Sequence, residues 1–316
     1  MENAAHPQSG GRIVVAGSLN ADLTIYTDRL PLPGETLHGS GFAVNPGGKS
    51  ANQAVAAARL GGTVTLIGAV GEDANGAMLL ASTAGAGVDV TRVKRTSEPT
   101  GVAVISVDAA GENSIIVAAG ANGTLAPADV DPAAFDGASV VGLCLEVPLE
   151  TVQAAAAAGH DAGATVLLNL SPFAQIPDEL AGLTDVLLVN AHEASQFLGG
   201  FALPSPAAPE SAWEPAVAQF AAHSLAQVLV TLGSQGSVVL DSTSATPVVR
   251  IAPTRVDAVD TTGAGDAFTG AVAARLAFGD TLADAARYAS VAAAMAATRK
   301  GTQTAYPTAA EVADFR

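Results

Sequence analysis

The sequence has few basic residues and almost no cysteine. Lysine and arginine number 14 against 30 aspartates and glutamates, which gives a formal net charge of −16, and lysine occurs only at Lys49, Lys94 and Lys300. So few cations cannot build a basic patch, and we expect no nucleic-acid partner. The single cysteine, Cys144, excludes an intrachain disulfide and a multi-cysteine zinc site, and its apolar neighbours predict a buried thiol.

Long apolar runs are also missing, although 49% of the 316 residues are hydrophobic. The most apolar stretches, such as 64–70 and 290–298, are far shorter than the roughly 20 residues that span a bilayer. Residues 1–12 contain no basic segment followed by an apolar core, so we interpret them as a frayed tail and not as a signal peptide. We therefore expect a soluble, cytoplasmic protein with no membrane partner.

Apolar, strand-like runs alternate with helical segments through most of the chain. This alternation is typical of an α/β fold with a mainly parallel sheet that is covered on both faces. The strand-like runs are 12–18, 63–71, 138–146, 165–171, 185–190, 226–233 and 248–259, and the helical segments are 50–61, 75–87, 149–163, 192–200 and 267–279.

Two insertions, about 20–46 and 100–120, depart from this rhythm. Both carry strand patterns with turns, and 100–120 reads as a hairpin because no helical segment separates its two apolar runs. We predict that they form a small antiparallel sheet, which acts as a lid over one edge of a single domain covering residues 1–316.

The stretch DTTGAGD at 260–266 lies between a strand-like run and a helical segment. Amide N–H groups of Gly263, Ala264 and Gly265 at a helix N-terminus would form an anion site, aided by the helix dipole. Asp266, in the first turn, is suited to accept the proton of a substrate hydroxyl that attacks a phosphoryl group. The alternative interpretation is an ordinary turn with Asp266 as a helix cap.

Polar residues that suit a sugar occur in two earlier motifs. Asn20 and Asp22 follow the first strand and would share a face of an extended segment, where amide and carboxylate can bind hydroxyl groups. An Asx turn is the alternative. In NPGGKSAN at 45–52, Gly48 allows close approach of a ligand, and Lys49 and Asn52 would face the same way on a helix. A relaxed P-loop at 43–50 is a weaker interpretation, because Pro46 lacks an N–H.

Two later motifs suit a nucleotide. Asn190 and Glu193 are one helical turn apart and could organise hydrated Mg²⁺, although the same spacing is that of a capping box. In TLGSQG at 231–236, Gly233 and Gly236 would let a base or phosphate approach the backbone after Thr231. A plain hairpin turn is the alternative there.

The assembled motifs resemble the ribokinase family of carbohydrate kinases over roughly residues 12–310. The resemblance is carried by GSLNADL, PGETLHG, NPGGKSANQAVAAARLG, LCLEVPLE, VNAHE, TLGSQG, AVDTTGAGDAF and ATRKGTQTAYP. It implies a three-layer α/β/α sandwich with a β-lid that also builds a homodimer. The implied reaction is ATP-dependent phosphorylation of a sugar, with D-ribose at its 5-hydroxyl as the expected substrate.

The resemblance also implies a role for each matching residue. Asp266 would be the general base, with Gly263, Ala264 and Gly265 as the anion hole. The sugar would be held by Asn20, Asp22, Gly48, Lys49, Asn52, Glu146 and Asp266. The nucleotide would contact Asn190, Thr231, Gly233, Gly236, Gly265 and Ser290, with Glu193 binding Mg²⁺ through water. A monovalent cation, usually K⁺, would lie at Asp260, Thr262, Ala296, Arg299, Gly301 and Ala305.

Several positions depart from the family pattern. Ser50 stands where glycine is usual and would either narrow the sugar pocket or cap a helix. Ala305 replaces a serine of the cation site, and Ser290 stands near the expected adenine position, where His or Asn is common. Another sugar or a nucleoside (fructose, deoxyribose or an adenosine-like molecule) is the alternative substrate. A sugar or nucleotide sensor without catalysis is the alternative function.

Overall fold

The computed structural model describes residues 11–110 and 112–315, so most of the expected N-terminal tail lies outside the described residues. Within these ranges, nine strands form one sheet in the order β13-β12-β11-β10-β9-β8-β1-β4-β5. Their bounds are β1 Arg12–Ala16, β4 Thr63–Gly71, β5 Asp89–Thr96, β8 Ala138–Leu143, β9 Thr165–Asn169, β10 Val186–Asn190, β11 Gln227–Thr231, β12 Ser237–Asp241 and β13 Val248–Ile251.

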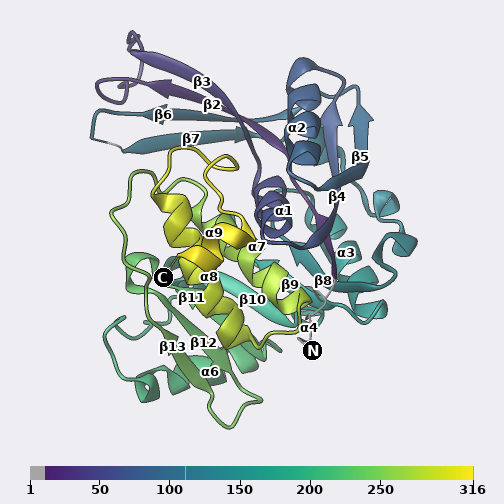
Figure 1. Ribbon diagram of the computed structural model, residues 1–316, viewed down its shortest axis with the longest axis vertical. Coiled ribbons are helices and arrows are strands. Elements are labelled where there is room, and N and C mark those ends of the chain that lie inside the picture. Colours follow the sequence, from purple (N-terminus) through teal and green to yellow (C-terminus); the bar gives the residue numbers. More distant parts are fainter. Residues whose placement is uncertain (1–10, 111, 316) are drawn as a thin grey trace, which may run out of the picture.

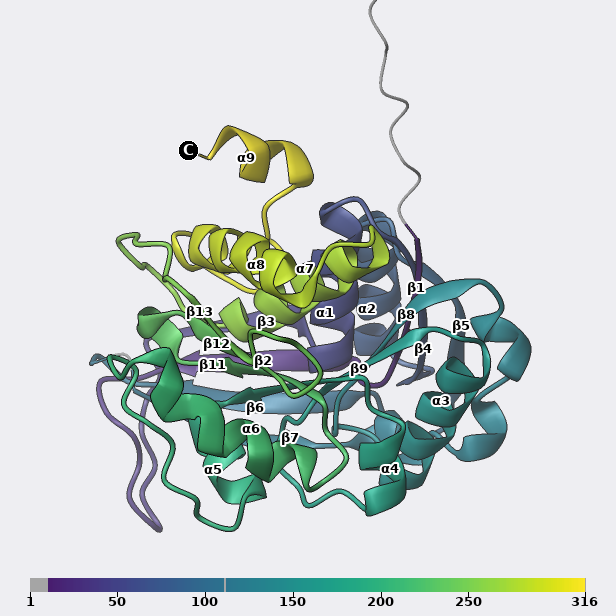
Figure 2. The same cartoon turned by 90° about the horizontal axis from the view of Figure 1, so that it is seen from below.

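Helices cover both faces of this sheet, as the view in Figure 2 shows. On one side lie α1 Lys49–Arg59, α2 Ala74–Gly85, α7 Ala264–Ala277, α8 Leu282–Ala297 and α9 Ala309–Asp314. On the other lie α3 Leu149–Asp161, α4 Asp178–Gly182, α5 Ala191–Phe197 and α6 Glu214–Ala221. Each side has its own buried apolar cluster. The predicted α/β/α sandwich is therefore confirmed.

The sheet is parallel from β5 to β11, and β12 and β13 add an antiparallel edge. Neither β5 nor β12 was predicted. The predicted strand over 248–259 is too long, because β13 ends at Ile251. Pro253 follows two residues later and has no N–H for a ladder hydrogen bond. A loop over 252–263 therefore separates this edge strand from α7.

The two insertions form a separate sheet in the order β3-β2-β6-β7, seen at the upper left of Figure 1. Its strands are β2 Asn20–Tyr26, β3 Gly41–Gly47, β6 Gly101–Val107 and β7 Asn113–Ala118. The predicted hairpin over 100–120 is confirmed, since β6 and β7 pair antiparallel. The prediction of a wholly antiparallel sheet is wrong, because β2 and β6 are parallel. Parallel partners need a crossover connection, and β3, α1, β4, α2 and β5 lie between these two strands in the chain.

Helices α1 and α7 pack closely because small residues line their contact. Gly270 of α7 is the tightest point: a Cβ there would lie 2.4 Å from the carbonyl oxygen of Gln53 and 2.6 Å from Ala56 Cβ. This packing places the first turn of α7 against the first turn of α1. None of the helices in the described residues is long and apolar enough to span a membrane.

We predict that Gly270→Ala lowers the free energy of unfolding by about 1–3 kcal/mol, because the added methyl overpacks the α1–α7 contact. The matched control is Gly85→Ala in α2, where a Cβ would meet nothing within 4 Å. That change should be neutral or stabilise by up to about 1 kcal/mol. Urea unfolding of both variants measures the difference, and equal midpoints would contradict the packing argument.

Candidate active site

Asp266 lies in the first turn of α7 and is only 8% exposed. Its carboxylate accepts hydrogen bonds from two side chains of α1: Asn52 Nδ2 donates at 2.9 Å and Gln53 Nε2 at 3.1 Å. The cap of α7 is Gly263, which makes no side-chain hydrogen bond. The interpretation of Asp266 as a helix cap is therefore wrong, because its carboxylate is directed at the neighbouring helix.

The pKa of Asp266 is raised, chiefly because burial penalises the charged carboxylate. The positive charge of Lys49 and the amides of Asn52 and Gln53 lower this pKa, and the negative charge of Glu146 raises it. Asp266 is thus a buried carboxylate with specific partners that favour its charged form. This is the balance expected of a group that exchanges a proton.

The loop before α7 ends at Gly263, whose backbone lies in the left-handed region. Gly263 has φ +73°, and a Cβ there would lie 2.7 Å from Tyr306 Oη, so both conformation and space require glycine. A Cβ on Gly265 would meet nothing within 4 Å, so the space beside this turn is open. The N–H of Ala264 differs from our expectation, because it donates to the Thr261 carbonyl oxygen at 3.1 Å.

Glu146 follows β8 and collects three donors. Its Oε2 accepts hydrogen bonds from Ser18 Oγ at 2.6 Å, from the backbone N–H of Lys49 at 3.1 Å and from Asn20 Nδ2 at 3.4 Å. These donors come from the β1–β2 junction and the start of α1. The structure therefore brings together residues from three distant parts of the chain, as expected at the carboxyl ends of parallel strands.

Asn20 and Asp22 lie on one face of β2, so the Asx-turn interpretation is wrong. Asn20 Oδ1 accepts a hydrogen bond from Asn122 Nδ2 at 2.8 Å. Asp22 lies against Gly47, where a Cβ would approach its Oδ2 to 2.2 Å. Burial, and then the charges of Glu146 and Asp266, raise the pKa of Asp22 to about 7, although Lys49 opposes the shift.

Lys49 begins α1 directly after Gly48, which has φ +90°. Burial lowers the pKa of Lys49, but the carboxylates of Asp266 and Glu146 outweigh it and raise this pKa overall. Ser50 does not cap the helix, since α1 has no side-chain cap. It is fully buried, and its Oγ lies 3.0 Å from Cys144 Sγ. Burial raises the pKa of that thiol to about 11, which fits the predicted buried cysteine.

The predicted nucleotide residues lie at the ends of β10 and β11, in the hairpin after β11, on α8 and, for Gly265, in the first turn of α7. Asn190 and Glu193 form the capping box of α5: Asn190 Oδ1 accepts from the N–H of Glu193, and Glu193 Oε2 accepts from the N–H of Asn190, both at 2.8 Å. Thr231 ends β11, and the hairpin to β12 turns through the 3-10 helix Gly233–Gln235. Gly236 has φ +91° and no room for a Cβ, which would lie 2.1 Å from Ile251 O.

Ser290 lies on α8, and its Oγ accepts a hydrogen bond from the N–H of Thr254 at 3.2 Å. This contact ties α8 to the loop that follows β13. Ser290 and the β11–β12 hairpin therefore both contact the segment directly after Ile251. The turn and capping-box interpretations of these motifs describe the fold correctly, and the binding roles stay predictions.

Asp260 joins the two loops expected to bind a monovalent cation. Its Oδ1 accepts from the N–H of Thr262 at 2.9 Å and its Oδ2 from the N–H of Gly301 at 3.0 Å. Burial raises the pKa of Asp260, but these hydrogen bonds lower it overall. Three other expected positions are close to Gly301 in the sequence. The carbonyl oxygen of Ala296 accepts a hydrogen bond from the N–H of Arg299, the Arg299 side chain forms an ion pair with Glu311, and Ala305 is buried. In the described ranges, no three His, Cys, Asp or Glu side chains gather as metal ligands.

Comparison with known proteins decides the family. Residues 11–309 match the description "pfkB family carbohydrate kinase". The chain belongs to the pfkB family of carbohydrate kinases. Among pfkB relatives, a ribokinase of Schizosaccharomyces pombe is 36% identical over 309 residues, 95% of this chain and 96% of the relative. A deoxyribokinase of Salmonella typhimurium is 36% identical over 299 residues, 93% of this chain and 95% of that protein.

Solved pfkB-like structures agree in fold. The structure of Arabidopsis thaliana ribokinase complexed with ribose and ATP superimposes with a TM-score of 0.88 at 33% identity, over 96% of this chain and 98% of that one. A ribokinase from Thermotoga maritima superimposes with a TM-score of 0.86 at 32% identity, over 96% and 99% of the two chains.

Sequence reasoning missed several residues of this pfkB site. Gln53 binds Asp266 directly, and Gln303 Nε2 donates to Asn52 Oδ1 at 3.1 Å. Tyr306 is fully buried beside Gly263, and its hydroxyl has no hydrogen-bond partner among the described residues. Glutamine and tyrosine carry no charge at neutral pH, so only their positions within the motifs 45–54 and 297–307 could have drawn attention to them.

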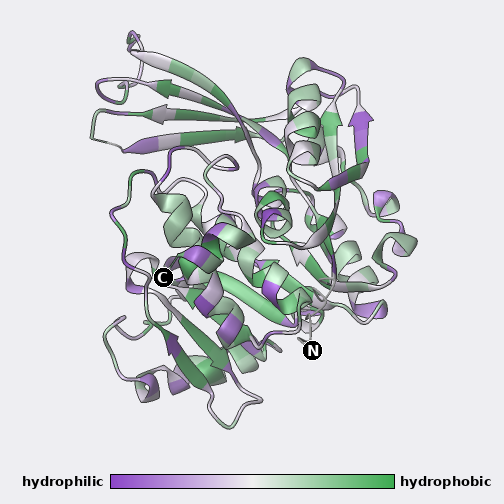
Figure 3. Ribbon diagram, viewed as in Figure 1, coloured by the Kyte–Doolittle hydropathy of each residue, from purple (hydrophilic) through white to green (hydrophobic). Residues whose placement is uncertain are grey.

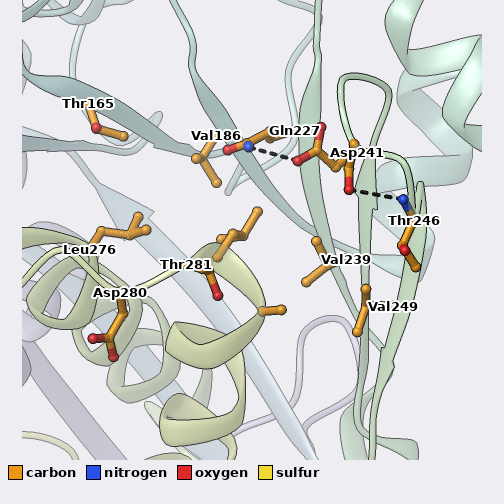
Figure 4. A pocket seen from close by; sticks show the side chains of 13 residues that line it. Thr165, Val186, Gln227, Val239, Asp241, Thr246, Val249, Leu276, Asp280 and Thr281 are labelled. Atoms are coloured by element: carbon orange, nitrogen blue, oxygen red, sulfur yellow. Dashed lines mark hydrogen bonds between the residues drawn. The ribbon is translucent and has the colours of Figure 1, made fainter.

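A hollow of about 420 Å³ lies elsewhere in the molecule. Figure 4 shows its lining, which includes Thr165, Val186 and Gln227 at the beginnings of β9, β10 and β11. Asn190 and Thr231 are at the opposite ends of two of these strands. This hollow therefore lies at the amino ends of the strands, opposite to the site at their carboxyl ends, and is not part of the site.

We predict that Asp22→Asn stabilises the protein at pH 8 and not at pH 4. The pKa of Asp22 is raised from 3.8 to about 7 in the folded state, so its ionisation lowers stability progressively as pH rises between these two values, and fully above about pH 7. Below the lower value both states are protonated and the cost disappears. The gain at pH 8 should be on the order of 2–4 kcal/mol. Urea unfolding of the variant and the wild-type protein at both pH values measures it.

Asp73→Asn provides a control of opposite sign. Burial alone would raise the pKa of Asp73, but hydrogen bonds from Thr100 and Gly76 lower it overall. This variant should therefore lose stability at pH 8 and lose less below about pH 3. A pH-independent difference for Asp22→Asn would contradict its raised pKa.

Proposed function

We propose that this protein is an ATP-dependent ribokinase, which phosphorylates D-ribose at O5 to D-ribose 5-phosphate. The observation that carries the proposal is the buried Asp266 carboxylate, which is held by two amides in the first turn of α7, where the space beside Gly265 is open. Relatives named ribokinase and the Arabidopsis complex with ribose and ATP support the substrates.

In the proposed reaction, Asp266 accepts the proton of the sugar 5-hydroxyl. The hydroxyl oxygen bonds to the γ-phosphorus of ATP, the bond from that phosphorus to the β–γ bridging oxygen breaks, and ADP leaves. Gly263, Ala264 and Gly265 serve as the anion hole for the transferring group. Since the N–H of Ala264 is bound to Thr261 in this conformation, its role requires the turn to open when the nucleotide binds.

The sugar pocket in this proposal consists of the polar cluster around Glu146. Asn20, Asp22 and Glu146 bind sugar hydroxyl groups, and Gly48, Lys49 and Asn52 complete the wall from the start of α1. Carboxylates and amides in a small space suit a short, fully hydroxylated ring. Ser50 faces Cys144, so its replacement of glycine does not narrow this pocket.

We further propose where ATP and its ions bind. The residues that line the nucleotide are Asn190, Thr231, Gly233, Gly236, Gly265 and Ser290. Glu193 binds Mg²⁺ through water, and Mg²⁺ supplies charge for the phosphates. K⁺ binds between the loops joined by Asp260, with Thr262, Ala296, Arg299, Gly301 and Ala305 contributing. Several of these positions would contribute backbone carbonyl oxygens. Ala305 lacks the hydroxyl of the serine that is common there, so we expect a weaker cation site.

The chain, in this proposal, is a single cytoplasmic domain that dimerises through its lid. Paired residues of the small sheet share a face, and Leu23, Val44, Val104 and Ile116 align on the face opposite to Asp22. Phe42 and Ile116 are 65% and 70% exposed. Figure 3 shows apolar segments on these strands, interrupted by paler and hydrophilic positions. An exposed apolar face of this kind suits a second copy of the chain.

An ATP-coupled assay over ribose, deoxyribose, fructose and adenosine, with and without K⁺, tests the function. We expect ribose to be turned over fastest and K⁺ to raise the rate. Asp266→Asn should lower kcat by about a hundredfold or more, because the base is lost, with ATP binding retained in calorimetry. No turnover of ribose, or full activity of Asp266→Asn, would refute the proposal.

For the dimer, we predict that Ile116→Glu converts the protein to a monomer at micromolar concentration. Ile115→Glu is the matched control, because Ile115 is 53% exposed on the same strand but points to the other face. Sedimentation equilibrium measures both. A wild-type monomer, or dissociation by the control alone, would contradict dimerisation through this face.

A further inference from the structure

A chain of side-chain hydrogen bonds leads to Asp266 from the loop between α8 and α9. Gln303 lies in this loop and is only 4% exposed. Its Oε1 accepts a hydrogen bond from Ser82 Oγ of α2 at 3.3 Å, and its Nε2 donates to Asn52 Oδ1 at 3.1 Å. Asn52 Nδ2 in turn donates to Asp266 Oδ2 at 2.9 Å. The chain therefore links three helices through two buried amides.

The order of donors along this chain fixes which way the Asn52 amide points. A carboxamide has a donor end and an acceptor end, and the donor of Gln303 occupies the acceptor end of Asn52. The donor end of Asn52 must then face Asp266. If the amide turned over, its oxygen would face the Asp266 carboxylate, and two acceptors would be opposed in a buried space.

We propose that Gln303 is a positioning residue for the base Asp266, acting through Asn52; this inference rests on the function proposed above. Gln303 lies two residues after Gly301, whose N–H binds Asp260. Through its hydrogen bond to Asn52, Gln303 connects the loop proposed to bind the cation with the carboxylate of Asp266. Gln53 supports the second oxygen of Asp266 independently of Gln303.

The side chain of Gln303 hydrogen-bonds Ser82 and Asn52, and it makes no hydrogen bond to the titratable groups around Asp266 within the described part of the chain. Lys49 favours the charged form of Asp266, and Glu146 opposes it. Burial is the main cause that raises the pKa of Asp22 and of Tyr306, and the negative charge of Asp266 contributes to both shifts. Weakening the Asn52 hydrogen bond therefore raises the pKa of Asp266 further. The acidic limb of kcat/KM should then move to higher pH.

The decisive variants are Gln303→Glu and Gln303→Met. The first keeps the shape but replaces the donor by an acceptor, so Asn52 turns its oxygen towards Asp266. The second removes both polar ends without adding charge. We expect each to lower kcat about tenfold or more. We also expect the acidic limb of kcat/KM to shift upward by about one pH unit, with the KM for ATP unchanged.

Gln227→Glu is the matched control. Gln227 Nε2 donates to Asp241 Oδ2 at 2.9 Å, so this change also disturbs a partly buried contact between glutamine and a carboxylate, but at the far edge of the sheet. It should cost stability and leave the pH profile unchanged. Thermal unfolding of all three variants separates loss of fold from loss of positioning. If Gln303→Glu does not fold, Gln303→Met decides.

The inference is overturned if the folded Gln303 variants have the same kcat as the wild-type protein and the same acidic limb of kcat/KM. Equal effects of the Gln303 and Gln227 variants would also overturn it, because they would reflect general destabilisation. The Asp266→Asn variant is assayed beside them to separate the two proposals. If it is inactive while the Gln303 variants match the wild type, only the positioning role fails. If it is active, the proposed function fails as well.

Discussion

The site depends on the two hydrogen bonds by which α1 holds the carboxylate of Asp266. A buried carboxylate is costly unless it is paired or hydrogen-bonded, so the two amides must be delivered at close range. That requires the two helices to approach closely, which Gly270 permits because it has no side chain at the crossing. The position of the Asp266 carboxylate therefore depends on the lack of a side chain at Gly270.

The electrostatics of the site follow from the burial of acidic groups. Burial is the main cause that raises the pKa of Asp22 and of Asp266, the negative charge of Glu146 adds to it, and the positive charge of Lys49 opposes it. Each of Asp22 and Asp266 therefore holds its proton more strongly than usual. A ligand rich in hydroxyl groups offsets the cost of burying these charged carboxylates, because its hydroxyl groups donate hydrogen bonds to them. A pfkB kinase that acts on a sugar has a use for such a site.

The motifs were informative because parallel strands end at the same edge of a sheet. Residues after β1, β8 and β10, far apart in the chain, could be grouped on that principle alone. Other features were less accessible. The parallel pairing of β2 with β6 depends on a long crossover, and the end of β13 depends on one proline. The hydrogen bond from Ala264 N to Thr261 depends on a loop conformation that no pattern specifies.

By itself, the sequence determined the α/β class, the positions of the glycine turns and the presence of Asp266 at a helix start. These are local properties, set by periodicity and by the conformations that glycine and proline allow. Only the tertiary structure decided that Asp266 binds α1 instead of capping α7, and that Gln53 and Gln303 belong to the site. The reason is that such contacts join residues more than 200 positions apart, and their formation depends on how closely two helices pack.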